Sequence, residues 1–363
     1  MPPIRIAACH AAPVFLSARD TTAKAISLIE RAARNKAQLV VFPETYIPAF
    51  PVWSALRPPT DNHDLFQRMA QESVFADGEE MHAIRAAAAK HSVAVSIGFS
   101  EKVRYSSATL FNSNVFIDKD SHVLVHHRKL MPTFFEKLTW APGDGYGLRV
   151  ADTAFGRIGN LICGENTNPL ARYALMAQGE QIHISTWPAI WPTRVPGNGD
   201  DGDNGDNGKA AKAAANYDNV MANRTRAAAH CFEAKCFGVL CSGVLGDDAI
   251  DTVAGGSAHL RDVLQHARRG VTMFLDPTGA PLQGLTFDAT TGESQAANFL
   301  QAHEDILYAD IDVADCVEGK QYHDVVGGYQ RLDVFSLQVN RSRRRPAHFV
   351  DVAEETGAVL PPE

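Results

Sequence analysis

Three residues with side chains suited to nucleophilic catalysis each stand directly after a run that predicts a buried strand. They are Glu44, Lys129 and Cys163. If these strands lie side by side, the three side chains converge at one edge of a sheet. A lysine ammonium favours the thiolate form of a neighbouring cysteine, and a carboxylate can accept the thiol proton and later a proton from water. The set therefore indicates covalent chemistry at the cysteine sulfur.

Each of the three residues also has an ordinary structural interpretation. Glu44 could cap a helix, Lys129 could be surface charge, and Cys163 could be a packed core cysteine. Gly164 follows the cysteine and begins a polar segment whose backbone N–H groups are free to meet a negative charge. Taken together, the three residues favour a reactive site over three unrelated structural roles.

The elements expected to position these residues begin with a strand over 4–9, a helix over 21–37 capped by Asp20, and a strand over 39–42. A helix over 79–90 and a strand over 93–99 repeat the unit, and a hairpin over 112–126 breaks the alternation. Later segments predict further strands, at 149–150, 158–162, 182–186, 237–241, 271–275 and 306–311, and helices at 169–178 and 209–234. The inventory predicts an α/β fold with a mixed sheet of many strands, or two such sheets stacked face to face.

Composition excludes several classes of function. The 363 residues are 45% hydrophobic and carry a formal net charge of -8, which argues against nucleic-acid binding. The basic run at 341–345 is expected to be a solvated tail or an intersubunit contact. No stretch approaches the roughly 18 apolar residues of a membrane span, and no signal segment precedes the first strand. Six scattered cysteines without a CxxC pair suit free thiols, so we expect a cytoplasmic protein.

One segment, 197–208, consists of glycine, aspartate and asparagine only. Its acidic residues raise the question of a calcium loop. Such a loop needs a closing bidentate glutamate, and counting from Asp201 that position holds Lys212. A surface loop is therefore favoured over a metal site.

The segments around the three residues resemble the signatures of the nitrilase superfamily of carbon–nitrogen hydrolases. The order and spacing of the segments fit that family, and the part that follows Lys129 is similar to the nitrilase branch. The likeness extends over roughly residues 4 to 340. The segments that carry it are Phe42-Pro43-Glu44-Thr45-Tyr46, Arg128-Lys129-Leu130-Met131-Pro132-Thr133, Glu136-Lys137-Leu138-Thr139-Trp140-Ala141-Pro142-Gly143-Asp144-Gly145, Cys163-Gly164-Glu165-Asn166, Gly255-Gly256-Ser257, Asp276-Pro277-Thr278-Gly279 and Leu307-Tyr308-Ala309-Asp310-Ile311-Asp312.

The resemblance implies a four-layer α-β-β-α sandwich over residues 1–315, with a C-terminal extension over 316–363 that contributes to subunit contacts. It also implies a homodimer or a larger, spiral homo-oligomer. From the composition, neither nucleic acid nor a membrane is expected as a partner. The implied reaction is hydrolysis of a small-molecule nitrile to a carboxylic acid and ammonia, without metal or organic cofactor. An aliphatic amidase using the same residues and a non-catalytic assembly scaffold remain as alternatives.

The resemblance also assigns catalytic roles. Cys163 is implied as nucleophile, Glu44 as general base, Lys129 as stabiliser of the charged intermediate, and Glu136 as a second carboxylate that positions Lys129 or water. The intermediates are a cysteine thioimidate and then a thioester.

Substrate preference is less determined by the sequence. Nitrilases commonly carry tryptophan directly after the cysteine, where this chain has Gly164, and a Gly-His-Tyr pattern where it has Gly327-Gly328-Tyr329. Trp53, Phe135 and Trp187, together with Phe134, either line an apolar substrate pocket or pack in the core. Gly164 is expected to leave volume that a tryptophan would fill, and His183 is expected to be a satisfied core histidine.

Overall fold

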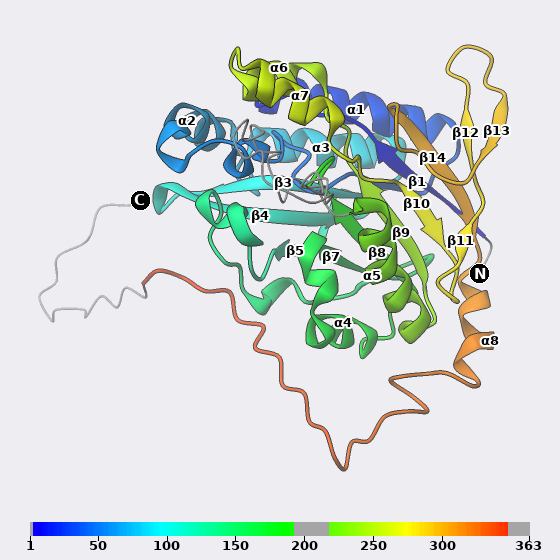
Figure 1. Cartoon of the computed structure of the whole chain (residues 1–363). Helices are drawn as coiled ribbons and strands as arrows, with labels where there is room; N and C mark the ends of the chain where they lie inside the picture. Colours follow the sequence, from blue (N-terminus) through cyan, green and yellow to red (C-terminus); the bar gives the residue numbers. More distant parts are fainter. Residues whose placement is uncertain (1–2, 192–217, 348–363) are drawn as a thin grey trace, which may run out of the picture.

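Two mixed β-sheets stacked face to face form the centre of the computed structural model, which describes residues 3–191 and 218–347 (Figure 1). The segment 197–208 and the start of the helix expected from 209 lie outside the described residues. The larger sheet has the order β13-β12-β14-β1-β2-β3-β4-β5, and the smaller has the order β11-β10-β9-β8-β7-β6. The larger sheet contains β1 (Ile4–His10), β2 (Leu39–Val41), β3 (Ala94–Val103), β4 (Ser106–Ile117), β5 (Val123–Arg128), β12 (Gly284–Phe287), β13 (Ser294–Ala297) and β14 (Asp305–Ile311).

The smaller sheet carries the strand that ends at the cysteine. β7 runs parallel to β8, and β8 runs parallel to β9, so their carboxyl ends lie at the same edge. In the larger sheet β1, β2 and β3 are likewise parallel. The strands of the smaller sheet are β6 (Ala151–Thr153), β7 (Gly156–Ile162), β8 (Ile182–Trp187), β9 (Phe237–Ser242), β10 (Met273–Leu275) and β11 (Pro281–Leu282).

Helices cover the outer face of each sheet. α1 (Ala18–Arg34) and α3 (Glu79–His91) pack on the larger sheet, and α4 (Pro169–Met176) and α5 (Asn219–Ala234) pack on the smaller one (Figure 1). The four-layer α-β-β-α sandwich is therefore confirmed. α1 starts earlier than expected because Ser17, not Asp20, is its N-cap: the Ser17 side chain accepts a hydrogen bond from the Asp20 N–H.

The apolar layer between the sheets holds the sandwich together. Side chains of β1, β2 and β14 meet those of β7, β8 and β9 there, all shielded from solvent. Each fully buried aliphatic side chain of this kind contributes about 1.5–3 kcal/mol of transfer free energy. The layer thus fixes the two sheets relative to each other, and with them the strand ends that carry polar residues. Examples from the two sides are Ile6, Val41, Leu307, Ile158, Ile184 and Val239.

A cap of three helices closes the end of the sandwich at which β1, β2 and β8 finish. These helices are α2 (His63–Glu72), α6 (Asp247–Ala254) and α7 (Ala258–His266). Their apolar faces share one buried cluster with Phe15, Trp53 and Ile190, which follow β1, β2 and β8. The cap therefore covers the strand ends where catalytic residues are expected.

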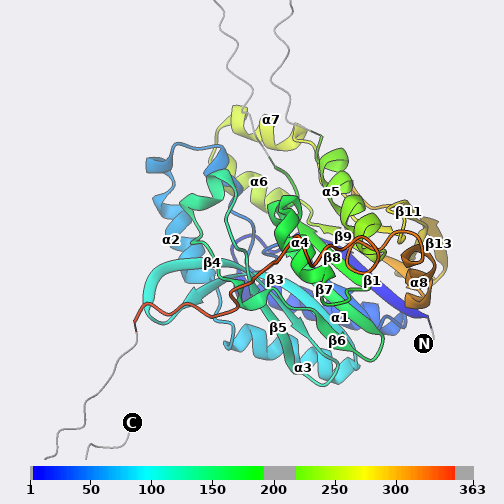
Figure 2. The ribbon, with the colours of Figure 1, turned by 90° about the horizontal axis from the view of Figure 1, so that it is seen from below.

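The C-terminal part leaves the sandwich after α8 (Cys316–Lys320) and runs as an extended segment along its outside, past α4 (Figures 1 and 2). Arg343 anchors this segment: its guanidinium donates to Asp144 Oδ1 at 3.2 Å and to the His126 carbonyl at 3.0 Å. The basic run at 341–345 is thus not simply a solvated tail, because Arg343 is partly buried against the strand that leads to Lys129. No helix in the described part of the chain is long and apolar enough to cross a membrane.

Candidate active site

Glu44, Lys129 and Cys163 reach one site from two sheets. Glu44 lies shortly after β2 and Lys129 directly after β5, both in the larger sheet, where β3 and β4 separate the two strands. Cys163 directly follows β7 in the smaller sheet. The expected convergence at the edge of a single sheet is therefore corrected: the side chains meet where the ends of two stacked sheets face each other. Facing sheets lie about 10 Å apart, a gap that long glutamate and lysine side chains can bridge.

Lys129 is the centre of the cluster. Its Nζ donates to Glu44 Oε1 at 2.8 Å and to Glu136 Oε1 and Oε2 at 2.8 and 2.7 Å. Cys163 Sγ and one carboxylate oxygen from each glutamate lie within 4.8 Å of one another. All four side chains are buried. The structure thus brings together the four residues that the sequence singled out for catalysis.

The two carboxylates are held differently. Glu136 belongs to the 3₁₀ helix η3 (Phe134–Leu138), and its Oε2 accepts the Thr133 N–H at 3.1 Å in a capping box. Glu44 Oε1 accepts the Asn112 side-chain amide at 2.7 Å, whereas Glu44 Oε2 has no hydrogen-bond partner among the described residues. The free oxygen leaves Glu44 able to accept a proton.

Three residues at or near the cluster adopt an unusual backbone conformation. Thr45, Phe134 and Cys163 have φ values of 41°, 48° and 50°, in the left-handed region that side chains other than glycine disfavour. Such residues cost of order 1–3 kcal/mol each and persist only where the surrounding structure holds them. The positive φ of Cys163 stands at the start of η5 (Cys163–Thr167), directly where β7 ends.

Charge balance sets the protonation of the cluster. Burial raises the pKa of Glu136 to about 7; the Lys129 ammonium opposes this rise and Glu44 adds to it. Burial alone would lower the pKa of Lys129, but Glu136 and Glu44 outweigh that effect and hold the pKa well above its usual value. Two carboxylates therefore share one cation, and the site holds an excess of negative charge when both are ionised.

The same charge balance corrects the expectation that Lys129 gives Cys163 thiolate character. Burial and the Glu44 carboxylate raise the pKa of the Cys163 thiol well above its usual value, and Lys129 only partly opposes them. The reason is that Lys129 is already paired with two carboxylates. The resting sulfur is protonated, and a base must remove that proton before the sulfur can attack.

Glu165 joins the two strand ends, a role that the sequence did not reveal. One of its oxygens accepts the Leu130 N–H at 2.6 Å, and the other accepts the Ile162 N–H at 2.8 Å. His127 Nε2 lies 2.9 Å from the same carboxylate. Glu165 therefore ties the residue after Lys129 to the residue before Cys163. It stood in a quoted motif, but only the fold shows which backbone groups it binds.

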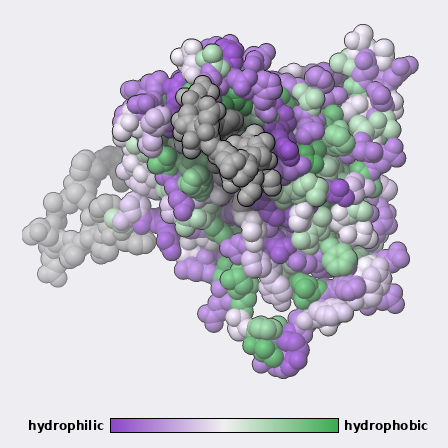
Figure 3. All heavy atoms as spheres, viewed as in Figure 1, coloured by the Kyte–Doolittle hydropathy of each residue, from purple (hydrophilic) through white to green (hydrophobic). Residues whose placement is uncertain are grey.

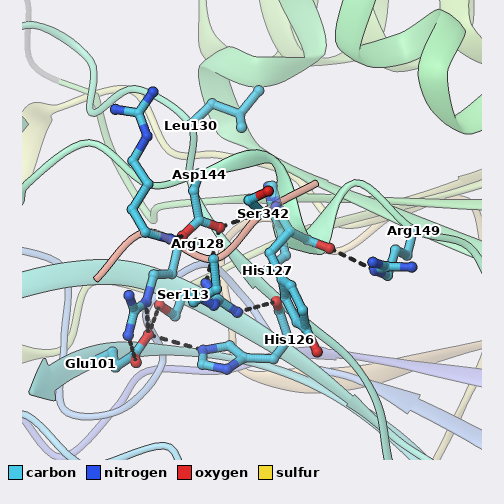
Figure 4. Close-up of polar contacts among 12 residues, drawn as sticks. Glu101, Ser113, His126, His127, Arg128, Leu130, Asp144, Arg149 and Ser342 are labelled. Carbon is cyan, nitrogen blue, oxygen red and sulfur yellow. Dashed lines mark hydrogen bonds and ion pairs between the residues drawn. The ribbon is translucent and has the colours of Figure 1, made fainter. Parts of the chain in front are cut away.

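A second carboxylate fixes the strand that leads to Lys129 (Figure 4). Glu101 on β3 accepts the Ser113 hydroxyl at 2.6 Å, lies 2.9 Å from His126 Nε2 and pairs with Arg128. Burial would raise the pKa of Glu101, but Arg128 and His126 bring it well below its usual value. This ionised network spans β3, β4 and β5 and limits the freedom of the backbone at Lys129.

Comparison with known proteins agrees with this geometry. A model of the carbon–nitrogen hydrolase family matches residues 5–321. The chain belongs to the carbon–nitrogen hydrolase family. A nitrilase of Penicillium rubens is 33% identical over 358 residues, covering 97% of this chain and 98% of that protein. A bromoxynil-specific nitrilase of Klebsiella pneumoniae subsp. ozaenae is 32% identical over 341 residues, covering 94% and 86%. Among solved structures, Nit3 of Saccharomyces cerevisiae matches with a TM-score of 0.63 at 15% identity, covering 92% and 97% of the two chains.

Trp53 and Trp187 lie in the core of this family member. Trp53 is 1% exposed and packs edge-on against Phe15 in the cap cluster, with ring centroids 6.0 Å apart. Trp187, also 1% exposed, shares a buried cluster with Cys163, and the Arg226 guanidinium lies 4.5 Å from the centroid of its ring. Both tryptophans are therefore packed core residues.

Phe135 instead joins an aromatic group next to Glu136. Its ring stacks on Trp191 with centroids 4.4 Å apart, and Phe50 packs edge-on against Phe135 at 6.3 Å. Phe50 and Trp191 were not expected from the sequence, because nothing along the chain marks them as neighbours of Phe135. The structure thus defines an aromatic wall formed by Phe50, Phe135 and Trp191.

Gly164 does not leave an empty volume. A Cβ atom at this position would lie 2.6 Å from Thr133 Oγ1, a distance that real Cβ contacts do not reach. The expectation of extra space is therefore wrong, because Thr133 occupies that space. Gly164 allows the turn at the cysteine and the turn that carries Glu136 to approach each other closely.

Proposed function

We propose that this chain is a nitrilase that converts an organic nitrile and water to a carboxylic acid and ammonia. The observation that carries the proposal is the buried cluster in which Lys129 bridges Glu44 and Glu136 beside the Cys163 sulfur. A nucleophile, a base and a cation in one water-poor site are what addition to a carbon–nitrogen triple bond requires. Several relatives that match over nearly the whole chain are named nitrilases, which supports nitriles as the substrate class.

The first half of the reaction forms a covalent thioimidate. Glu44 takes the thiol proton of Cys163, and the sulfur attacks the nitrile carbon. One π bond breaks, and its electron pair moves to nitrogen, where Lys129 and the Gly164 N–H meet the developing charge. The nitrogen takes the proton that Glu44 removed from the thiol, which leaves the substrate carbon bound to sulfur and to an N–H group.

The second half hydrolyses this intermediate in two steps. Glu44 accepts a proton from water as the oxygen adds to the thioimidate carbon, and passes this proton to the nitrogen. The carbon–nitrogen bond then breaks, and the nitrogen takes the remaining proton of that water and leaves as ammonia. A thioester remains. A second water, again activated by Glu44, releases the carboxylic acid and returns the Cys163 thiol. Glu136, with its pKa raised to about 7, keeps Lys129 in place while the charge on Glu44 changes.

The acyl side of the substrate meets the aromatic wall of Phe50, Phe135 and Trp191 in this proposal. An apolar cavity beside Glu44 extends the same surface; its lining includes Phe15, Tyr46, Val52 and Leu245. Aryl and alkyl groups gain free energy on burial against such surfaces. Gly164 contributes to the shape of the pocket through its close contact with Thr133. Trp53 and Trp187 contribute to it as packed side chains that support the pocket.

An aliphatic amidase would use the same four residues on an amide, and a scaffold would use none of them. To separate the three, we would measure ammonia release from a panel of nitriles and their matched amides, with Cys163→Ala as control. Nitrile turnover that disappears in Cys163→Ala is the expected result. Turnover of amides alone would establish the amidase, and no turnover of either would favour the scaffold; both contradict the nitrilase.

We further propose a homo-oligomer in which α4, α5 and the C-terminal extension from residue 316 contribute subunit contacts. Leu170, Met221, Leu332 and Phe335 expose 62%, 60%, 74% and 73% of their surface. Figure 3 shows apolar side chains among polar ones on this face of the molecule. Light scattering should give a mass above that of a 39.4 kDa monomer, and a monomer at all concentrations would contradict this.

All six cysteines are buried and free, which supports a cytoplasmic location.

A further inference from the structure

A second buried cluster lies behind the nucleophile. It consists of Glu180, which precedes β8, His183 on β8 and His230 on α5, each at most 1% exposed. His183 Nδ1 lies 2.8 Å from Glu180 Oε1, and His230 Nε2 lies 2.6 Å from Glu180 Oε2. The two imidazole rings stack with centroids 3.6 Å apart. A zinc ion would hold such ligand atoms about 3.3 Å or more from one another, so the short distances indicate direct hydrogen bonds.

Asn166 connects this cluster to Cys163. Its side-chain Nδ2 donates to the Cys163 carbonyl at 3.0 Å and to the Leu161 carbonyl at 3.1 Å. Its Oδ1 lies 2.8 Å from His183 Nε2. Since carbonyl oxygens only accept, the amide nitrogen must face them, and this fixes Oδ1 as an acceptor toward His183.

Hydrogen-bond accounting gives the direction of the contact between His183 and Asn166. Because Asn166 Oδ1 only accepts, His183 Nε2 is the donor. On the other side of the ring, Nδ1 faces Glu180 Oε1. Glu180 therefore holds the ring in the orientation in which Nε2 donates to Asn166.

The surroundings agree with this assignment. Burial would raise the pKa of Glu180, but His183 and His230 bring it down to about 2, so the carboxyl is ionised. Burial lowers the pKa of His230 to about 4, and the neighbouring His183 lowers it as well. His230 is therefore neutral, and its Nδ1 has no partner within the described ranges, as a lone pair without a proton can tolerate.

Room for Glu180 and His183 is provided by a glycine on the strand that ends at the cysteine. Gly159 on β7 pairs with His183 on β8, and a Cβ atom at Gly159 would overlap the Glu180 carboxylate. Other charged or titratable groups that face the cluster are Arg172 on α4 and the thiol of Cys236. A glycine inside a strand is typical of such a close approach.

We propose that His183 is a positioning residue for the nucleophile. Held by Glu180, it orients Asn166, and Asn166 holds the left-handed backbone of Cys163 through the carbonyl of that residue. The chain Glu180–His183–Asn166 thereby directs the sulfur toward the two carboxylates and Lys129. This inference rests on the proposed role of Cys163 in nitrile hydrolysis.

The test compares two variants of matched shape, His183→Phe and His230→Phe, in the full-length protein. Each removes one hydrogen bond to Glu180, but only the first removes the donor to Asn166. The readout is the rate at which iodoacetamide alkylates Cys163, followed by peptide mass spectrometry, together with kcat and KM on a nitrile. We expect His183→Phe to slow alkylation and to lower kcat about 100-fold, as for a nucleophile displaced by about 1 Å, with little change in KM.

His230→Phe should reduce stability toward urea about as much as His183→Phe does, because each variant loses one hydrogen bond to Glu180. The alkylation rate and kcat of His230→Phe should stay within about threefold of wild type. His183→Gln, which keeps an N–H for Asn166, should recover most of the lost rate. Equal losses in the two phenylalanine variants, in proportion to the unfolded fraction, would overturn the proposal. If His183→Phe does not fold, Asn166→Ala tests the same link, and unchanged alkylation there would also overturn it. Alkylation needs no nitrile turnover, so a failure of the proposed function is distinguishable from a failure of this inference.

Discussion

The protein contains two buried clusters of titratable side chains close to Cys163, and they differ in the number of partners that each carboxylate has. In front, Glu44 and Glu136 share the single cation Lys129. Behind, the single carboxylate of Glu180 is shared by two imidazoles. Burial is the same in both, yet the pKa of Glu136 rises to about 7 and that of Glu180 falls to about 2.

Burial raises the pKa of both carboxyl groups, so the comparison shows that the partners decide whether this rise is offset. A buried carboxylate that shares its cation with a second carboxylate retains affinity for a proton near neutral pH. This suits a site where protons move during each turnover. A carboxylate with two imidazole partners stays ionised, which suits a fixed support. The front cluster is therefore fitted for reaction, and the rear cluster for holding the backbone.

Removing the cation of the front cluster should have the largest effect. In Lys129→Met two buried carboxylates lose their partner, and the charge that develops on the substrate nitrogen is no longer met. We expect nitrile turnover to fall by about 10³-fold or more and the free energy of unfolding to fall by about 3–5 kcal/mol. Steady-state kinetics and urea unfolding measure the two effects.

The matched control is Lys119→Met. Lys119 lies in an exposed turn and, within the described part of the chain, pairs with its neighbour Asp120 alone. Its replacement should change neither nitrile turnover nor the free energy of unfolding noticeably. A Lys129→Met protein that keeps wild-type turnover would contradict the role of the front cluster.

The pH dependence of stability should differ in sign between the two clusters. Glu136 has a pKa in the folded protein above the ordinary value of 4.5, so its stabilising contribution is complete below pH 4.5 and is lost as the pH rises to about 7. Glu180 has a lowered pKa, so its contribution is present above pH 4.5 and is lost as the pH falls toward 2.

Urea unfolding across this pH range, with the variants Glu136→Gln and Glu180→Gln, measures both contributions. Glu136→Gln should remove part of the decline in stability between pH 4.5 and 7. The penalty of Glu180→Gln should be greatest above pH 4.5 and shrink toward pH 2. The same pH dependence in both variants would show that the two clusters do not differ as described.

A smaller effect, on the free energy of unfolding alone, is expected from adding a methyl group next to the rear cluster. In Gly159→Ala the new methyl group overlaps the Glu180 carboxylate, and we expect a loss of about 1–3 kcal/mol in the free energy of unfolding, as for other overpacked core sites. Gly243→Ala is the control, because its Cβ would meet its neighbours at an ordinary 3.6 Å. Equal stability of the two variants would mean that Glu180 does not need the space at Gly159.

The strand ends singled out Glu44, Lys129 and Cys163, because a strand end is a local signal. The four layers of the fold and the place of Glu136 were implied by the family resemblance. The sequence did not predict that Glu44 and Cys163 belong to different sheets, since sheet membership depends on long-range pairing. The protonation of Cys163 was also beyond the sequence: whether Lys129 acts on the thiol depends on how many carboxylates surround its ammonium, and only distances reveal that.

The supporting residues illustrate the same limit. His183 was expected to be a satisfied core histidine, and it is buried with both ring nitrogens hydrogen-bonded. Its neighbour His230 is distant in the chain and reaches it only because α5 packs on β8. Trp53 had two interpretations from the sequence, and its place in the cap core became evident only once α2, α6 and α7 were seen to pack around it.

The measurement that tests the central claim most directly is the site of covalent attachment during turnover. Acid quenching of the protein with a nitrile substrate, followed by peptide mass spectrometry, would locate the adduct among the six cysteines. Our account predicts an adduct on Cys163 that is lost in Cys163→Ala and retained in Cys236→Ala. An adduct on another cysteine, or undiminished nitrile hydrolysis by Cys163→Ala, would contradict it.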